Sequence, residues 1–157
     1  MKRKNLYLLC GPAGVGKTTW VENNIQDDTK DIHISRDLIR FSMVSEDEDY
    51  FSKENEVFNE FIRQIKEGID LYENIFVDAT HINQTGRNKV LRNLPLDKIN
   101  IIPVNFIIPL DVCLKRNAQR TGRAKVPETA IKNMYKNFSP ANHQEKYKYH
   151  IILNVKE

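Results

Sequence analysis

The sequence is poor in cysteine, in long apolar runs and in net charge, and each shortage excludes a class of protein. Its two cysteines, Cys10 and Cys113, form no C-x-x-C pair and join no His/Cys cluster. Both lie among apolar neighbours, so we interpret them as buried free thiols in a reducing compartment. No segment reaches the length of a membrane span, and the apolar stretch after the basic N-terminus is too short for a signal peptide. We therefore expect a cytoplasmic protein without membrane contact.

The net charge is only +3, from 24 basic and 21 acidic residues, which argues against a protein that coats nucleic acid through bulk charge. Charge is nevertheless uneven along the chain. Residues 111–136 hold seven lysines and arginines against two acidic residues, whereas residues 45–50 form an acidic run that we interpret as a solvated loop. No repeat, linker or low-complexity segment divides the sequence, and we expect one domain over residues 1–157.

The most specific motif begins at Gly11. Residues 11–18 read Gly-Pro-Ala-Gly-Val-Gly-Lys-Thr, a full match to the phosphate-binding loop G-x-x-x-x-G-K-[ST]. An apolar run precedes it and a helix-compatible stretch follows, which is the context that this loop requires; a chance glycine-rich turn is the alternative. Lys17 would reach the β- and γ-phosphates of ATP, and the Thr18 hydroxyl would ligate Mg²⁺. The expected ATP-binding residues of this segment are Gly11, Pro12, Ala13, Gly14, Val15, Gly16, Lys17, Thr18 and Thr19.

Strand-like and helix-like segments alternate along the chain. The expected strands cover residues 5–10, 32–35, 74–78, 99–108 and 150–155. The expected helices cover residues 18–26, 36–43, 54–72 and 110–120, with one more that Asn83 caps and Pro95 ends, and a last one that begins at Pro127. Strands separated by helices predict an α/β fold with a five-stranded parallel sheet flanked by helices. Pro103 falls inside the fourth strand, so we expect its paired part to begin at Val104.

Ligands of such a sheet bind beyond the carboxyl ends of the strands, and this rule selects two carboxylates. Asp37 follows the second strand, where it could accept a proton from an acceptor hydroxyl. Arg40 shares its helix face and could hold an acceptor phosphate, although a surface ion pair between the two is an equal alternative. Asp78 ends the third strand, the position of a carboxylate that holds Mg²⁺; a capping aspartate is the alternative.

Three arginines follow the fourth strand. Arg116 and Arg120 are one helical turn apart and project together, and Arg123 lies in the basic loop of residues 121–126. Arginines on a lid can close over a nucleotide and neutralise transition-state charge. This hypothesis assigns all three arginines to ATP binding, while solvated surface charge explains the same spacing.

Four blocks of the sequence resemble the kinase domain of phage polynucleotide 5′-hydroxyl kinases, which belong to the P-loop kinase superfamily. The blocks are the phosphate loop with Thr19-Trp20, Ser35-Arg36-Asp37-x-x-Arg40, Asp78-x-Thr80, and Lys115-Arg116-Asn117-x-x-Arg120 through Val126-Pro127 to Met134-Tyr135. The last block is more restricted than the first and makes this family the best match. The resemblance implies a P-loop kinase fold with a basic lid.

The resemblance also implies roles for individual residues. Asp37 would be the general base, Arg40 would hold the acceptor phosphate, and Arg120 would bind the donor phosphates with Arg116 assisting. The sequence departs from the family pattern at His81, where asparagine is usual, and in a segment one residue longer between Arg120 and Pro127. These departures bear on the acceptor contacts and on the geometry of the lid.

Together these features predict an ATP- and Mg²⁺-dependent kinase that phosphorylates the 5′-hydroxyl of a DNA or RNA strand. The chain has no spare length for the phosphatase or ligase domain that often accompanies such kinases, so we expect it to work alone or with separate repair proteins. A small-molecule kinase acting on a nucleoside or another metabolite is one alternative. A toxin-like or regulatory ATP-binding module, in which Asp37 is no base, is another.

Overall fold

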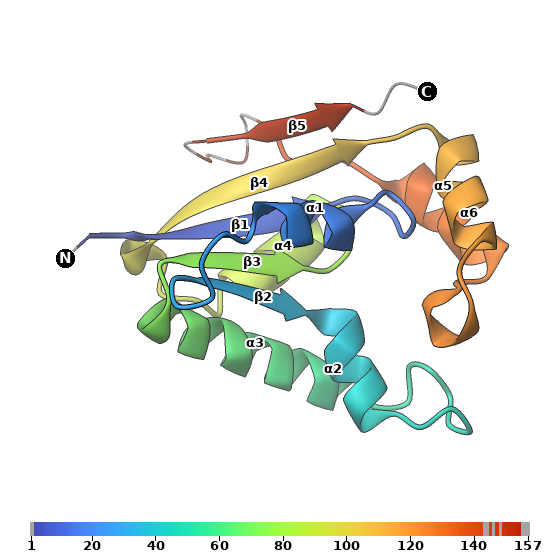
Figure 1. Ribbon diagram of the computed structural model, residues 1–157, viewed down its shortest axis with the longest axis horizontal. Coiled ribbons are helices and arrows are strands. Elements are labelled where there is room, and N and C mark those ends of the chain that lie inside the picture. The colour runs from blue at the N-terminus through green and yellow to red at the C-terminus, as the bar shows by residue number, and fades with distance from the viewer. Residues whose placement is uncertain (1, 143–144, 146, 148, 155–157) are drawn as a thin grey trace.

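Five parallel strands form one sheet at the centre of the computed structural model, which describes residues 2–142, 145, 147 and 149–154 (Figure 1). In sequence order they are β1 (Lys4–Cys10), β2 (Asp31–Ser35), β3 (Asn74–Asp78), β4 (Ile99–Ile107) and β5 (Ile151–Asn154). Their order across the sheet is β2-β3-β1-β4-β5, and every neighbouring pair is parallel. The sheet expected from the sequence is thus confirmed; the last residue of the expected fifth strand, Val155, lies outside the described residues.

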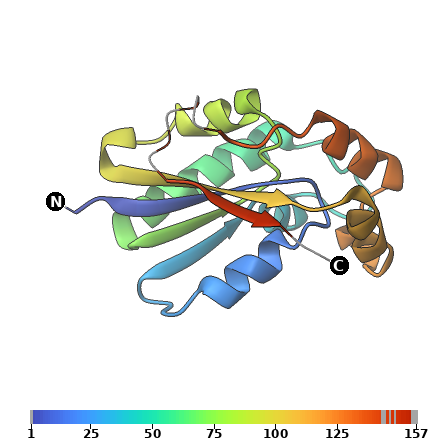
Figure 2. The same cartoon turned by 90° about the horizontal axis from the view of Figure 1, so that it is seen from above.

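Helices connect the strands and cover both faces of the sheet. They are α1 (Lys17–Asn24), α2 (Arg36–Met43), α3 (Glu54–Leu71), α4 (Gln84–Leu91), α5 (Leu110–Ala118) and α6 (Glu128–Asn137), with the short 3-10 turns η1 (Leu96–Lys98) and η2 (Gly122–Ala124). α3 and α4 cover one face and α1 the other, while α5 and α6 lie at the carboxyl ends of the strands (Figure 2). None of the described helices is both long and apolar enough to cross a membrane.

Side chains alternate along β1 and divide the core into two parts. Leu8 and Cys10 belong to the part under α3 and α4, whereas Leu9 belongs to the part under α1 and α5. The apolar face of α3 that the sequence pattern predicted packs in the first part, with Phe61 and Ile65 fully buried. Burying a side chain of this size stabilises a fold by roughly 1.5–3 kcal/mol. This packing fixes the sheet whose carboxyl edge carries the candidate site.

Several element boundaries differ from the expectation by a few residues, and two of the differences concern β4 and α5. β4 pairs with β1 from Ile99 onward, with Pro103 opposite Leu8, so the expected start of pairing at Val104 is wrong on this side. It is right on the other side, because β5 pairs with β4 only from Val104. Pro103, which has no N–H to donate, therefore sits where the strand has a single neighbour. The helix expected to reach residue 120 ends at Ala118, which leaves Arg120 beyond α5.

Candidate active site

The phosphate loop connects β1 to α1 at the carboxyl edge of the sheet (Figure 1). Gly14 and Gly16 have φ angles of 87° and 93°, a conformation that favours glycine. A Cβ at Gly14 would lie 2.8 Å from the carbonyl oxygen of Cys113, so the loop packs directly on α5. Gly16 is the N-cap of α1, whose free N–H groups and positive helix end suit an anion. Cys113, like Cys10, is a buried free thiol as expected.

Lys17 opens α1 with its ammonium over the loop. Its Nζ donates hydrogen bonds to the carbonyl oxygens of Gly11 and Pro12, each at 2.8 Å. Removal from water lowers the pKa of Lys17, and the carboxylates of Asp78 and Asp37 act in the opposite direction. Both carboxylates singled out from the sequence are therefore within electrostatic range of the phosphate-loop lysine.

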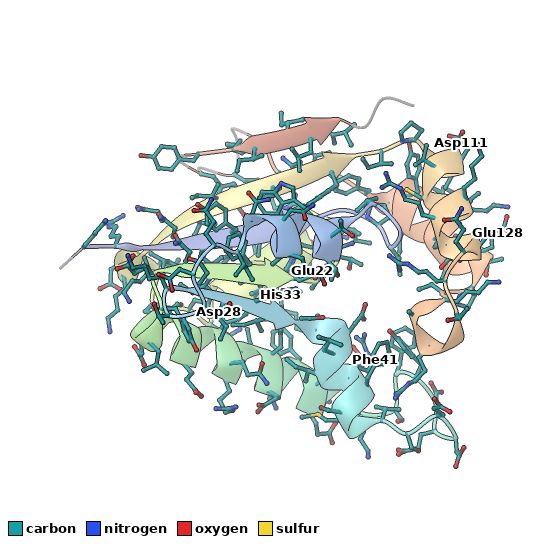
Figure 3. The ribbon with its side chains drawn as sticks, viewed as in Figure 1. Glu22, Asp28, His33, Phe41, Asp111 and Glu128 are labelled. Carbon is teal, nitrogen blue, oxygen red and sulfur yellow. The ribbon has the colours of Figure 1, made fainter. Side chains whose placement is uncertain are left out.

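Asp78 joins three elements at the end of β3. Its Oδ2 accepts a hydrogen bond from the Thr18 hydroxyl at 2.9 Å and lies 2.8 Å from Nε2 of His33. Figure 3 labels His33 on β2. Burial opposes ionisation of Asp78, but the bond with His33 and the charge of Lys17 outweigh it, so its pKa lies below the ordinary value. The two expected metal ligands, Thr18 and Asp78, are thus brought together. A hydroxyl and an ionised carboxylate are hard oxygen donors of the kind that Mg²⁺ prefers.

Sequence reasoning missed His33. Its contact with Asp78 requires β2 to lie beside β3. In this pairing Ser35 lies opposite Asp78, and His33 lies two residues before Ser35 on β2. The order of the strands in the sheet is a property of the fold, and no motif in the sequence marks it.

Asp37 lies in the first turn of α2, which Ser35 caps by accepting a bond from the Leu38 amide at 3.2 Å. The Asp37 side chain is 65% exposed, so its carboxylate is open to an incoming acceptor. Its Oδ1 accepts hydrogen bonds from Nη1 of Arg40 at 2.7 Å and from the Tyr50 hydroxyl at 3.1 Å. These two donors fix the orientation of a carboxylate that is otherwise free in solvent.

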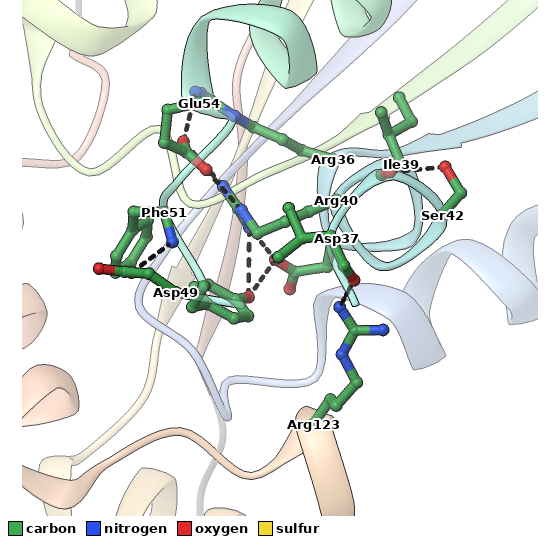
Figure 4. Close-up of polar contacts among 11 residues, drawn as sticks. Arg36, Asp37, Ile39, Arg40, Ser42, Asp49, Phe51, Glu54 and Arg123 are labelled. Carbon is green, nitrogen blue, oxygen red and sulfur yellow. Dashed lines mark hydrogen bonds and ion pairs between the residues drawn. The ribbon is translucent and has the colours of Figure 1, made fainter. Parts of the chain in front are cut away.

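Arg40 is buried between two carboxylates, and the second of these was not expected (Figure 4). Its Nε and Nη2 donate to the two oxygens of Glu54 at 2.6 and 3.0 Å, while Nη1 donates to Asp37 and to the Tyr50 hydroxyl. All three nitrogens of its guanidinium are thereby bonded. Burial would lower the pKa of Arg40, but the bonds with Glu54 and the charges of Tyr50, Glu54 and Asp37 raise it. The ion pair weighed from the sequence exists, and Glu54 anchors it.

Arg116 and Arg120 lie on the donor side of the site. Nη1 of Arg116 donates to the carbonyl oxygen of Val15 at 3.0 Å, so this arginine contacts the phosphate loop itself. Arg120 follows the end of α5, and its Nη1 lies 3.4 Å from the Ala124 carbonyl oxygen. Its charge contributes to the lowered pKa of Lys17, which places Arg120 within electrostatic range of the loop.

Arg123 lies elsewhere than the sequence hypothesis placed it. Its guanidinium donates to the carbonyl oxygens of Phe41 and Val44 at the end of α2, and it stacks 4.6 Å from the centroid of the Phe41 ring. Figure 4 shows this side chain reaching from η2 towards α2. Binding ATP would require these contacts to break, so a role for Arg123 in ATP binding stays a prediction.

His81, the departure from the family pattern, is a buried structural residue. Its Nδ1 lies 2.7 Å from the carbonyl oxygen of Leu9, and it is a non-glycine residue with a positive φ of 44°. Burial lowers its pKa to about 4, so the ring is neutral near pH 7. It ties the segment after β3 to β1, and the amide of Gly11 bonds the Thr80 carbonyl oxygen beside it at 2.8 Å.

A known protein family matches the part of the chain that contains this site. A family described as an AAA domain matches residues 6–141, most of the chain. The chain belongs to this AAA domain family. The match includes the phosphate loop, Asp37, Asp78 and the segment with the three arginines, and the AAA domain here has the P-loop kinase fold. Among curated proteins, none matches the chain.

Solved structures of several kinases share this AAA domain's fold. A chain of the Pnkp1/Rnl/Hen1 RNA repair complex superposes with a TM-score of 0.75 at 18% identity over 87% of this chain and 44% of its own length. A fungal RNA kinase superposes with a TM-score of 0.68 at 17% identity, over 100% of this chain and 77% of its own. A gluconokinase from Sinorhizobium meliloti gives 0.62 at 14% identity, over 100% and 86%. This chain spans less than half of the RNA repair protein, and all three likenesses are of fold alone.

Proposed function

We propose that this P-loop kinase domain transfers the γ-phosphate of ATP to the 5′-hydroxyl of a DNA or RNA strand. One observation carries the proposal: an exposed carboxylate, Asp37, is oriented by a buried arginine and lies within electrostatic range of Lys17. A base beside the phosphate loop is what an alcohol acceptor requires.

In the proposed reaction, the 5′-oxygen attacks the γ-phosphorus as the bond to the β–γ bridging oxygen breaks, and ADP leaves. Asp37 takes the hydroxyl proton. Lys17 and the amides of the phosphate loop hold the donor phosphates, while Arg116 and Arg120 neutralise charge that develops during transfer. Thr18 and Asp78 would hold Mg²⁺, which neutralises phosphate charge when bound.

Arg40 is the residue that would favour a strand as acceptor, because it would bind the phosphate that a strand carries. Its Nη1 donates a hydrogen bond to Asp37, so Arg40 lies beside the place where the phosphate next to the reacting nucleoside would come. A guanidinium suits this task because it binds phosphate oxygens without reading bases. The likeness to an RNA kinase and to a chain of an RNA repair complex supports this assignment.

A small-molecule kinase is the second candidate, because the gluconokinase fold covers the whole chain. The test compares kcat/KM for 5′-hydroxyl oligonucleotides, nucleoside 3′-phosphates, free nucleosides and gluconate, with γ-labelled ATP as donor. Preferred labelling of oligonucleotides and nucleoside 3′-phosphates supports the proposal. Preferred labelling of gluconate or free nucleosides overturns it in favour of the second candidate, and no transfer at all favours an ATP-binding module.

A further inference from the structure

An aromatic cluster borders the proposed base, in a segment that the sequence marks only as an acidic loop. The Tyr50 ring packs edge-to-face on the Phe51 ring, with centroids 4.8 Å apart and planes at 85°. Phe41 of α2 also makes an edge contact with the Tyr50 ring, with centroids 6.3 Å apart. The cation of Arg40 lies 4.7 Å from the Tyr50 centroid and 5.5 Å from that of Phe51. The rings of Phe41, Tyr50 and Phe51 therefore form one side of the proposed acceptor site, which we call the aromatic wall.

Specific bonds hold this wall against α2. The Tyr50 hydroxyl bridges Asp37 and Arg40, and the Phe51 amide donates to Oδ1 of Asp49 at 3.0 Å (Figure 4). Lys53 closes the loop by donating to the Met43 carbonyl oxygen at 2.8 Å. The loop is thus tied at both ends to the helix that carries the base.

Phe51 is 61% exposed although it is tied down in this way. Arg123 covers the Phe41 ring, and the Tyr50 ring packs on both Phe41 and Phe51. Phe51 is therefore the member of the cluster whose surface is most available to a ligand. A large apolar side chain exposed next to a site commonly contacts the ligand of that site.

We propose that Phe51, supported by Tyr50, is the surface on which the first nucleobase of the acceptor strand stacks; this inference rests on the proposed function. The Phe51 ring centroid lies 4.8 Å from that of Tyr50, whose hydroxyl bonds Asp37, so Phe51 neighbours the proposed base. Bases of all four kinds stack on aromatic side chains, so this contact binds the acceptor without selecting a sequence.

The charge around the wall favours a base over other acceptor groups. Residues 46–49 are Glu-Asp-Glu-Asp, and the nearby Lys53 is paired with Glu48 at 3.4 Å. Such a surface disfavours an anionic group against Phe51, whereas a neutral nucleobase carries no charge to repel. The acidic loop thus favours a base over a phosphate at Phe51 itself, while the strand phosphate would lie at Arg40.

The test uses oligonucleotides whose 5′-terminal residue carries either a normal base or no base. With wild-type protein, loss of the base should lower kcat/KM by about 5- to 150-fold, the range expected for one stacked base. Phe51→Ala should lose a similar factor on the normal oligonucleotide and almost nothing more on the abasic one. Phe51→Trp should retain the preference because it keeps an aromatic face. Leu71→Ala is the matched control, since Leu71 is 64% exposed at the end of α3.

Different results overturn different claims. If wild-type protein labels abasic and normal ends equally, or if Phe51→Ala loses the same factor on both, the stacking surface is refuted and the polynucleotide kinase stands. If gluconate is labelled and no oligonucleotide is, the proposed function falls and the stacking surface with it.

Discussion

Asp37 and Glu54 both bond to Arg40, and we expect opposite effects when each carboxylate is neutralised. The Asp37 variant should lose turnover, and the Glu54 variant should lose stability. Asp37→Asn keeps an oxygen for the Arg40 and Tyr50 donors but removes the proposed base. Asp37 is 65% exposed, so we expect its loss of charge to change the free energy of unfolding by less than about 1 kcal/mol. Loss of a general base should lower kcat by about 10²–10⁴-fold, which corresponds to roughly 3–5 kcal/mol of barrier.

Glu54→Gln is the matched control, because it changes one carboxylate of the same arginine. Glu54 accepts two bonds from a guanidinium whose side chain is only 7% exposed. Hydrogen bonds to charged groups contribute about 1.5–3 kcal/mol, and the 31% exposure of Glu54 places the expected loss near the lower end, about 2 kcal/mol. Asp37 keeps both of its donors in this variant, so kcat should fall by less than about tenfold.

The two assays are thermal unfolding and steady-state transfer with saturating ATP. For a chain of this length 1 kcal/mol shifts Tm by about 2–4 °C, so Glu54→Gln should lower Tm by roughly 4–8 °C and Asp37→Asn by less than about 4 °C. ATP affinity should be unchanged in Asp37→Asn. If Asp37→Asn retains most of its turnover while Glu54→Gln loses it, Asp37 is not the base and the reasoning about this site is wrong.

Four further substitutions separate the roles of the arginines. Arg120→Ala should lower kcat more than it weakens ATP binding, because the charge of Arg120 acts on the transition state. Arg116→Ala should lower kcat in the same way but by a smaller factor. Wild-type turnover in both variants would make the two arginines solvated surface residues. Arg40→Ala should reduce kcat/KM for nucleoside 3′-phosphates far more than for free nucleosides, and equal losses would remove its role on the acceptor phosphate. Arg123→Ala tests its expected role in ATP binding against its contact with α2: a tenfold weaker Kd for ATP would support the role, and a Kd within about twofold of wild type would remove it.

The parts of this site that the sequence predicts are local or follow directly from the fold class. The phosphate loop is one contiguous segment, so its glycine spacing alone predicts the turn into α1. Thr18 and Asp78 meet because parallel strands end at one edge of the sheet, and the alternation of strands and helices already predicts that arrangement. Asp37 and Arg40 form their pair because three residues separate them on one helix.

The parts that the sequence does not predict depend on how distant segments pass one another. Glu54 reads as an ordinary acidic residue in the first turn of a helix, and its bond to Arg40 follows from the packing of α3 on α2. Tyr50 ends an acidic run that has the composition of a solvated loop, yet its hydroxyl donates to Asp37. The contact of Arg123 with α2 is also not predicted, because its place in a basic loop does not show that η2 turns towards α2.

The most direct test of the central claim is a competition in a single reaction. Wild-type protein receives γ-labelled ATP with equal concentrations of a 5′-hydroxyl oligonucleotide and gluconate, and the position of the label is determined by digestion of the oligonucleotide to nucleotides. Lys17→Ala is run in parallel, since it removes the cation nearest to the transferred phosphate. The account predicts label on the 5′-terminal nucleotide with wild-type protein and none with Lys17→Ala. Label on gluconate, or equal labelling of the strand by both proteins, would contradict it.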